Sequence, residues 1–340
     1  MESRSGTPAS AGKPAAAASA GFWRWLLALV VGFSLPVLAC YGLIVVSAIA
    51  LQVLSLGTTP AGLPGGSAPG FGPAVGLIRV EGLIVAERDP FDAVTAASAR
   101  EIVAHIRQAQ TDPEVRALLL LVNSPGGSVV ATDEIHHALQ EFSKPVVVAI
   151  GEIGASGGYY IAAGADWIMA NPNSLTGSIG VISQFPNATG LLEKIGVDFV
   201  VITSGPRKDF GSPYREMTVA ERRYWQSVID EVHEAFVDVV AAGRGLPEGD
   251  VRRLADGSVY TGRRALELGL VDALGYEEDA LAEAAALGDI EGEPRVIEYQ
   301  AVPTFLDFLR YASGRAALPS LTEILTWIGH PTLAARWIGP

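Results

Sequence analysis

The fold of this chain is decided by one stretch, Ala117-Leu118-Leu119-Leu120-Leu121-Val122-Asn123-Ser124-Pro125-Gly126-Gly127-Ser128. An uninterrupted apolar run ends in a turn rich in proline and glycine. Such a run predicts a strand that is buried on both faces, which is the usual environment of a strand in a parallel sheet. The turn then lies at the carboxyl end of that strand.

The same alternation of strand and helix continues along the chain. It predicts an α/β fold with a parallel sheet and right-handed crossovers, in which functional sites form at the carboxyl ends of the strands. The expected strands cover residues 74–85 (two strands around Gly82), 117–122, 145–150, 167–170, 199–203 and 295–299, and the expected helices cover 94–110, 129–142, 156–163 and 218–242.

Composition excludes some functions. The net charge of -13 over 340 residues argues against nucleic acid as a partner, because phosphate binding needs clustered basic side chains. The single cysteine, Cys40, excludes an intrachain disulfide. Only four of the 24 basic residues are lysines, and arginine cannot serve as a neutral base.

The N-terminal region predicts a membrane anchor. Residues 1–24 are expected to be a disordered, cytoplasmic N-terminus, and residues 25–56 carry no charge. A helix through 25–56 would be about 45 Å long against a hydrocarbon core of about 30 Å, so one tilted or kinked transmembrane helix fits. Basic residues precede this segment and none follows until Arg79, which places the large domain on the outer side.

Other interpretations of the flanking regions stay open. A cleaved signal peptide is the alternative to an anchor, with small residues at Ser47-Ala48-Ile49-Ala50. Residues 57–73 are expected to be a flexible linker, and 74–300 the folded domain. Residues 301–340 have the spacing of amphipathic helices; this tail could pack on its own domain, lie on a membrane surface or reach a neighbouring subunit.

A serine in a glycine-rich turn, Gly154-Ala155-Ser156-Gly157-Gly158, is the candidate nucleophile. The glycines permit a sharp turn from strand to helix and a close approach of substrate to the backbone. A serine hydroxyl needs a base to accept its proton. The structural alternative is a turn in which Ser156 only caps a helix.

The candidate base is Lys208. The histidines lie in predicted helices or near the C-terminus, so a Ser-His-Asp triad is possible but unsupported. A lysine acts as a base only when neutral, and an apolar site favours the neutral form. Asp209 would oppose this, so we expect it to point away or to pair with Arg207. The alternative for Lys208 is a solvated charge on a loop.

An oxyanion site is the third requirement for acyl-bond hydrolysis. Backbone N–H groups of the Pro125-Gly126-Gly127 turn could hold the carbonyl oxygen, with the N–H of Ser156 as the second donor. In isolation this segment also fits an ordinary turn between a strand and a helix.

Several segments within residues 75–276 carry a resemblance to a known family: 123–127, 155–160, 176–181, Ser204-Gly205 with Lys208-Asp209, Ser212-Pro213 with 215–218, and Asp256-Gly257 with 259–262. Through these segments the chain resembles the signal peptide peptidase A family of membrane-anchored bacterial serine proteases. The resemblance implies a Clp-protease/crotonase-like fold, a Ser-Lys dyad and cleavage of signal peptides left in the bacterial inner or plasma membrane. It also implies a homo-oligomeric ring and no metal or other cofactor.

Residue roles follow from this resemblance by position. Ser156 is the nucleophile and Lys208 the general base, the N–H of Gly127 lines the oxyanion hole, and Ser178 orients the lysine amine. The alternative function is a catalytically inactive or acyl-CoA-related crotonase-like membrane scaffold. A CoA enzyme would need a basic nucleotide pocket, which this acidic chain does not indicate.

Overall fold

The computed structural model describes residues 72–88, 96–300 and 334–336. Within them, the main sheet has eight strands: β10-β7-β6-β4-β1-β11 in order, with β8 joined to β6 and β9 to β8. All these pairs are parallel except β8–β9, so the predicted, mostly parallel α/β sheet is confirmed. The strands are β1 (Ala74–Glu81), β4 (Val115–Ser124), β6 (Val146–Ala155), β7 (Trp167–Ala170), β8 (Leu175–Gly177), β9 (Val259–Thr261), β10 (Ala273–Leu274) and β11 (Arg295–Tyr299).

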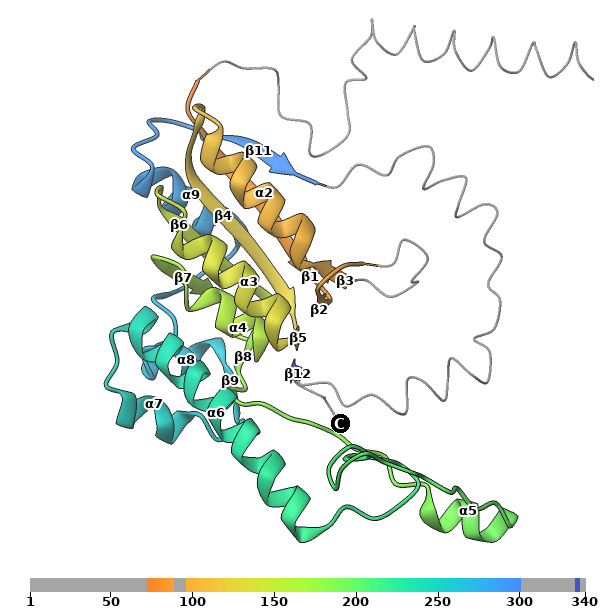
Figure 1. Ribbon diagram of the computed structural model, residues 1–340. Coiled ribbons are helices and arrows are strands. Elements are labelled where there is room, and N and C mark those ends of the chain that lie inside the picture. Colours follow the sequence, from red (N-terminus) through yellow and green to blue (C-terminus); the bar gives the residue numbers. More distant parts are fainter. Residues whose placement is uncertain (1–71, 89–95, 301–333, 337–340) are drawn as a thin grey trace, which may run out of the picture. The chain divides into compact units, whose positions relative to one another are not determined.

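Both faces of the sheet are buried, as the apolar run of β4 requires. Leu118 and Leu120 pack toward α2 (Ala99–Thr111) and α3 (Val129–Gln140). Leu119 and Leu121 pack in a separate cluster that includes α9 (Glu277–Leu287). Figure 1 shows the central strands with α2, α3 and α4 (Gly157–Ala162) along one face. The remaining helices among the described residues are α5 (Thr189–Ile195), α6 (Val219–Arg244), α7 (Glu248–Leu254) and α8 (Gly262–Glu267).

A second, smaller sheet stands at the carboxyl end of β4. Its order is β12-β5-β2-β3, formed by β12 (Ala334–Arg336), β5 (Gly126–Ser128), β2 (Leu83–Val85) and β3 (Ala96–Ser98). The glycine turn predicted after β4 is therefore itself a strand. One edge of β5 pairs with β2 and the other pairs antiparallel with β12.

Two predicted elements differ from the structure. The helix expected from residue 94 begins at Ala99, because the Ser98 side chain accepts a hydrogen bond from the N–H of Glu101 and caps it. Residues 199–203 were expected to form a buried strand. They have no strand partner among the described residues, and Val200 and Ile202 are 89% and 93% exposed.

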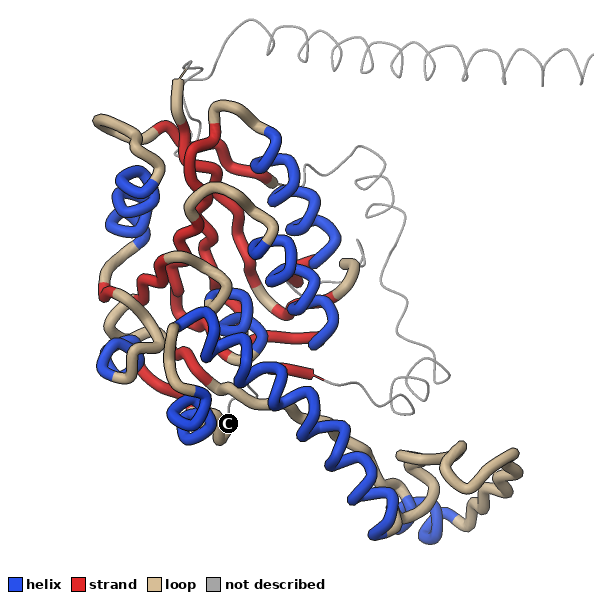
Figure 2. The backbone as a smooth tube through the Cα atoms, turned by 60° about the vertical axis from the view of Figure 1, so that its left-hand side comes forward, coloured by secondary structure: helices blue, strands red, loops and turns tan. Residues whose placement is uncertain are grey.

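Residues 181–218, which we call the arm, project from the domain between β8 and α6 (Figure 2). Only the C-terminal half of α6 joins the core, through Phe236, Val237, Val240 and Ala241. The arm has its own aromatic cluster: the rings of Phe185 and Phe210 lie 5.6 and 5.1 Å from Trp225 on the N-terminal half of α6. It is thus an organised extension of the domain.

Several predictions fall outside the described residues. The predicted N-terminus (1–24), the transmembrane helix (25–56), nearly all of the linker (57–73) and most of the tail (301–340) are among them. Within the part of the chain that the structure describes, every helix is too short or too polar to cross a bilayer.

Candidate active site

Ser156 occupies a strained elbow between β6 and α4. Its φ of 53° and ψ of -118° are unusual for a residue with a side chain, and the residue is only 1% exposed. Such a conformation costs on the order of 1–3 kcal/mol and persists only where the surroundings impose it. Here the Ser156 N–H donates to the carbonyl of Gly177 at 2.8 Å, and the Ser156 carbonyl accepts from Tyr160 at 2.9 Å.

Gly158 of this motif allows two segments of the chain to pack closely. A Cβ on Gly158 would lie 2.7 Å from the carbonyl oxygen of Ser124, so the first turn of α4 fits against the end of β4 only without a side chain there. The sequence indicated that the glycines allow substrate to approach the backbone closely. At Gly158 the close neighbour is instead the backbone of Ser124, within the same chain. This close approach holds Ser156 beside the segment that leads into β5.

Gly127 lies at the centre of β5. A Cβ at this position would be 2.0 Å from the carbonyl oxygen of Ile84, so the two backbones approach each other more closely than any side chain allows. On the opposite edge of β5, Gly127 faces Ala335 of β12. That edge therefore accepts an antiparallel strand.

Ser178 follows the strand that pairs with the elbow. Ala155 is the partner of Gly177 in the parallel β6–β8 ladder, so Ser156 and Ser178 leave adjacent strands at the same edge. Ser178 has a φ of 49°, is 7% exposed, and its N–H donates to the carbonyl of Ser258 at 2.7 Å. The fold thus brings these two serines to one place.

Lys208 is not brought to that place within the single chain. It lies on the arm, is exposed, and its amine has neither a hydrogen bond nor an ion pair with any described residue. Its neighbour Asp209 was expected to point away or to pair with Arg207, and the pairing with Arg207 is wrong. Asp209 is held elsewhere, by Arg215 at 2.7 Å, whereas Arg207 lies over the ring of Tyr224 at 4.6 Å.

The N–H of Ser156 was expected to be the second oxyanion donor, but it is not free for that role. It is consumed by the hydrogen bond to Gly177, because the β6–β8 ladder extends one residue past the end of β6. The next donor along the chain is the N–H of Gly157. It is the first residue of α4, and helix geometry leaves the first N–H groups without an intrahelical partner.

An ion network at the junction of the arm with the N-terminus of α6 was missed from the sequence. Arg215 bridges Asp209 and Glu221, at 2.7 and 2.5 Å, and Glu221 forms a capping box with Thr218 at the start of α6. The hydrogen bonds from Arg215 hold the pKa of the Glu221 carboxyl at about 2 and lower the pKa of Asp209. The spacing Thr218-Val219-Ala220-Glu221 was the available signal.

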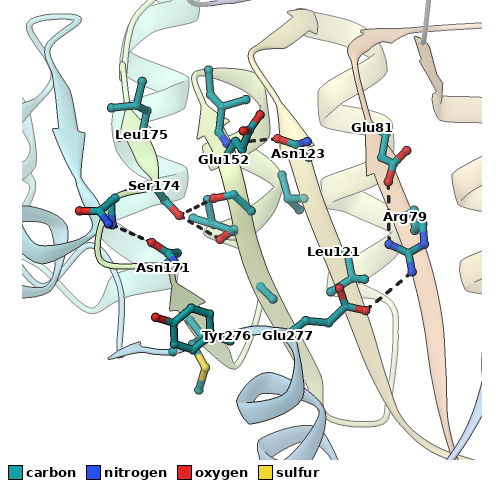
Figure 3. A pocket seen from close by; sticks show the side chains of 18 residues that line it. Arg79, Glu81, Leu121, Asn123, Glu152, Asn171, Ser174, Leu175, Tyr276 and Glu277 are labelled. Carbon is teal, nitrogen blue, oxygen red and sulfur yellow. Dashed lines mark hydrogen bonds and ion pairs between the residues drawn. The ribbon is translucent and has the colours of Figure 1, made fainter.

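A cavity of about 830 Å³ lies over the carboxyl-terminal halves of β4 and β6 (Figure 3). Arg79 reaches toward Glu81 and Glu277 at its rim, and Asn123 accepts a hydrogen bond from the N–H of Ile153. Ser156, Ser178 and Gly127 do not line it. It is therefore a separate feature, not the pocket of the candidate nucleophile.

Comparison with known proteins agrees with this architecture. The Clp protease model matches residues 86–176, and the model of peptidase family S49 matches residues 138–291. The fold is thus that of a Clp-protease-like α/β domain, and the matched region contains the strained serine elbow.

The relatives define the family more closely. A predicted protease of Synechocystis sp. is 42% identical over 241 residues, covering 68% of this chain and 86% of that protein. A predicted signal peptide peptidase SppA of Enterococcus faecium is 42% identical over 54% of each chain. Protease 4 of Salmonella typhi is 37% identical over 65% of this chain and 36% of its own length. The chain belongs to peptidase family S49.

Proposed function

We propose that this protein is a membrane-bound serine endopeptidase that hydrolyses peptides, signal peptides among them, with Ser156 as nucleophile and Lys208 as general base. The observation that carries the proposal is the Ser156 elbow. A buried serine is held at positive φ at the end of a parallel strand, beside Ser178 and close to β5. Strain of this kind is characteristic of functional positions.

The chemistry follows from these groups. Neutral Lys208 takes the Ser156 proton, and the Ser156 oxygen attacks the peptide carbonyl. The N–H groups of Gly127 and Gly157 hold the oxyanion, while Ser178 orients the lysine amine. The lysine then protonates the leaving amine and activates the water that hydrolyses the acyl-enzyme.

The outer edge of β5 supports the binding of a peptide. Its pairing with β12 is antiparallel, with Ala335 opposite Gly127. A peptide substrate that takes the place of β12 at this edge would pair with β5 through backbone hydrogen bonds largely independent of its sequence. Its carbonyl groups would then pass close to the proposed oxyanion donor.

The position of Lys208 bears on assembly. The lysine is exposed on the arm, whereas Ser156 is buried in the domain. The same arm exposes an apolar run, residues 199–202, that finds no partner strand among the described residues. We therefore place the dyad between copies: the arm of one copy lies on the next and delivers Lys208 to its Ser156. Repeated around a rotation axis, this head-to-tail contact would close into a ring.

Location and substrate complete the proposal. The uncharged segment 25–56 anchors the chain, with the N-terminus in the cytoplasm and the protease domain on the outer face of the membrane. Anchoring places the active sites where cleaved signal peptides remain. The similarity to relatives named as signal peptide peptidase and protease supports this substrate class.

Covalent labelling tests the proposal. The full-length protein and its Lys208→Ala variant are treated with a serine-reactive fluorophosphonate between pH 6 and pH 10 and analysed by peptide mass spectrometry. We expect a label on Ser156 that depends on Lys208 and increases with pH. A folded, assembled protein that takes no label at Ser156 would contradict the proposal and favour the scaffold.

A further inference from the structure

A second cavity adjoins the serine elbow on the side of α6. It has a volume of about 300 Å³ and lies between α3, α4, α6 and the start of the arm. Its lining includes Val129, Val130, Thr132, Tyr160, Val181 and Phe236.

Three segments that carry the proposed active site also form the walls of this cavity. Val129 begins α3 directly after β5, Tyr160 lies one turn after Ser156 and donates its N–H to the Ser156 carbonyl, and Val181 follows Ser178 by three residues. A side chain of a peptide bound along β5 therefore has this cavity within reach of the bond being cut.

The walls are mostly apolar and well fixed. The Tyr160 hydroxyl donates to the Asp133 carboxylate at 2.9 Å, and the Tyr160 ring packs against Phe236 at 5.0 Å between centroids. Phe236 is itself buried in the core, whereas Val130 is 66% exposed. The cavity is thus open to solvent on one side and closed by the core on the other.

Thr132 is the exception in this lining. It is 1% exposed, and its hydroxyl has no hydrogen-bond partner in the described part of the chain. A threonine within a helix ordinarily returns its hydroxyl to a backbone carbonyl one turn earlier. Buried hydroxyl groups are rarely left without a partner, so an unpaired one beside a cavity points to a group that arrives with a ligand.

We infer that this cavity receives a substrate side chain next to the scissile bond, and that the Thr132 hydroxyl selects side chains that join an apolar frame to a hydrogen-bonding group, such as threonine or tyrosine. This inference rests on the proposed protease function. An isosteric side chain without the hydroxyl would leave Thr132 unpaired in the complex, which lowers kcat/KM for that substrate.

Matched pairs of fluorogenic peptides test the inference. Threonine is compared with valine, and tyrosine with phenylalanine, at each of the four positions around the cleaved bond. We expect the wild-type protein to prefer the hydroxyl-bearing peptide by about tenfold in kcat/KM at one position only. Thr132→Val should abolish or reverse this preference, and Thr132→Ser should keep it.

The controls separate the possible failures. Thr111→Val, at the exposed end of α2, should leave the preference unchanged, and thermal unfolding verifies that each variant folds. Cleavage that shows no such preference, or one that survives in Thr132→Val, would overturn the inference. Absence of cleavage of every peptide, together with absence of Ser156 labelling, would instead contradict the proposed function.

Discussion

The sheet edge and the arm carry the two halves of the proposed dyad in opposite ways. At the edge, Ser156 is buried, and its backbone donates a hydrogen bond to Gly177 and accepts one from Tyr160. On the arm, Lys208 is exposed, and so are the neighbouring apolar side chains of Val200 and Ile202. One half is complete within the chain, whereas the other has the character of a surface that another molecule covers.

The largest effects are expected from substitutions of the two proposed dyad residues, Ser156 and Lys208. Ser156→Ala should reduce kcat by at least about 10⁴-fold. Lys208→Arg should do the same, because arginine remains charged and cannot accept the serine proton. Lys194→Arg, on α5 of the same arm, is the matched control and should keep wild-type turnover. Peptide hydrolysis measures all three, and appreciable activity in Lys208→Arg would remove Lys208 from the mechanism.

Glycine replacements contrast the packing of the two regions. Gly127→Ala places a methyl group 2.0 Å from the Ile84 carbonyl oxygen and should lower the free energy of unfolding by more than about 3 kcal/mol. Gly190→Ala, within α5 of the arm, meets nothing within 4 Å and should stabilise by about 0.5–1 kcal/mol. Urea unfolding gives both values. Equal changes in the free energy of unfolding would contradict the close approach of β5 to β2.

Apolar side chains should likewise behave differently in the two regions. Leu120→Ala in the core should cost about 2–5 kcal/mol of folding stability. Ile202→Ser is expected to leave monomer stability within about 0.5 kcal/mol, because the side chain is 93% exposed, yet to weaken assembly. Urea unfolding and sedimentation velocity report the two properties. A strongly destabilised Ile202→Ser monomer would mean that the apolar run packs within its own chain.

Acid should loosen the arm before the sheet. The hydrogen bonds from Arg215 hold the pKa of Glu221 at about 2, below the usual value of about 4.3 in an unfolded chain. A lowered folded-state pKa stabilises the arm at neutral pH, and this contribution is lost as pH falls from about 4.3 toward 2. Hydrogen exchange at residues 209–221 should rise in that range. The Glu221→Gln variant should exchange faster at neutral pH. Its exchange should not rise further through protonation of residue 221 as the pH falls, because glutamine does not titrate.

The sequence was most informative where a residue pattern is compatible with only one kind of structure. The apolar run at 117–122 could be buried only between two helical layers, and the strand at 295–299 was placed correctly. The pairing that consumes the Ser156 N–H depends on the register of β8, which the sequence does not show. The run at 199–203 has the composition of a strand, but it pairs with no strand among the described residues, and its side chains are exposed. Under our proposal a neighbouring copy covers it.

Mixed assemblies test the central claim, that one dyad is shared between copies. Ser156→Ala and Lys208→Ala chains, each inactive alone, are co-expressed in equal amounts with different tags and purified together as full-length rings. In random rings about a quarter of the contacts join an intact Ser156 to an intact Lys208, so we expect about a quarter of wild-type activity. Correctly assembled mixed rings without activity would contradict a dyad formed between neighbouring chains.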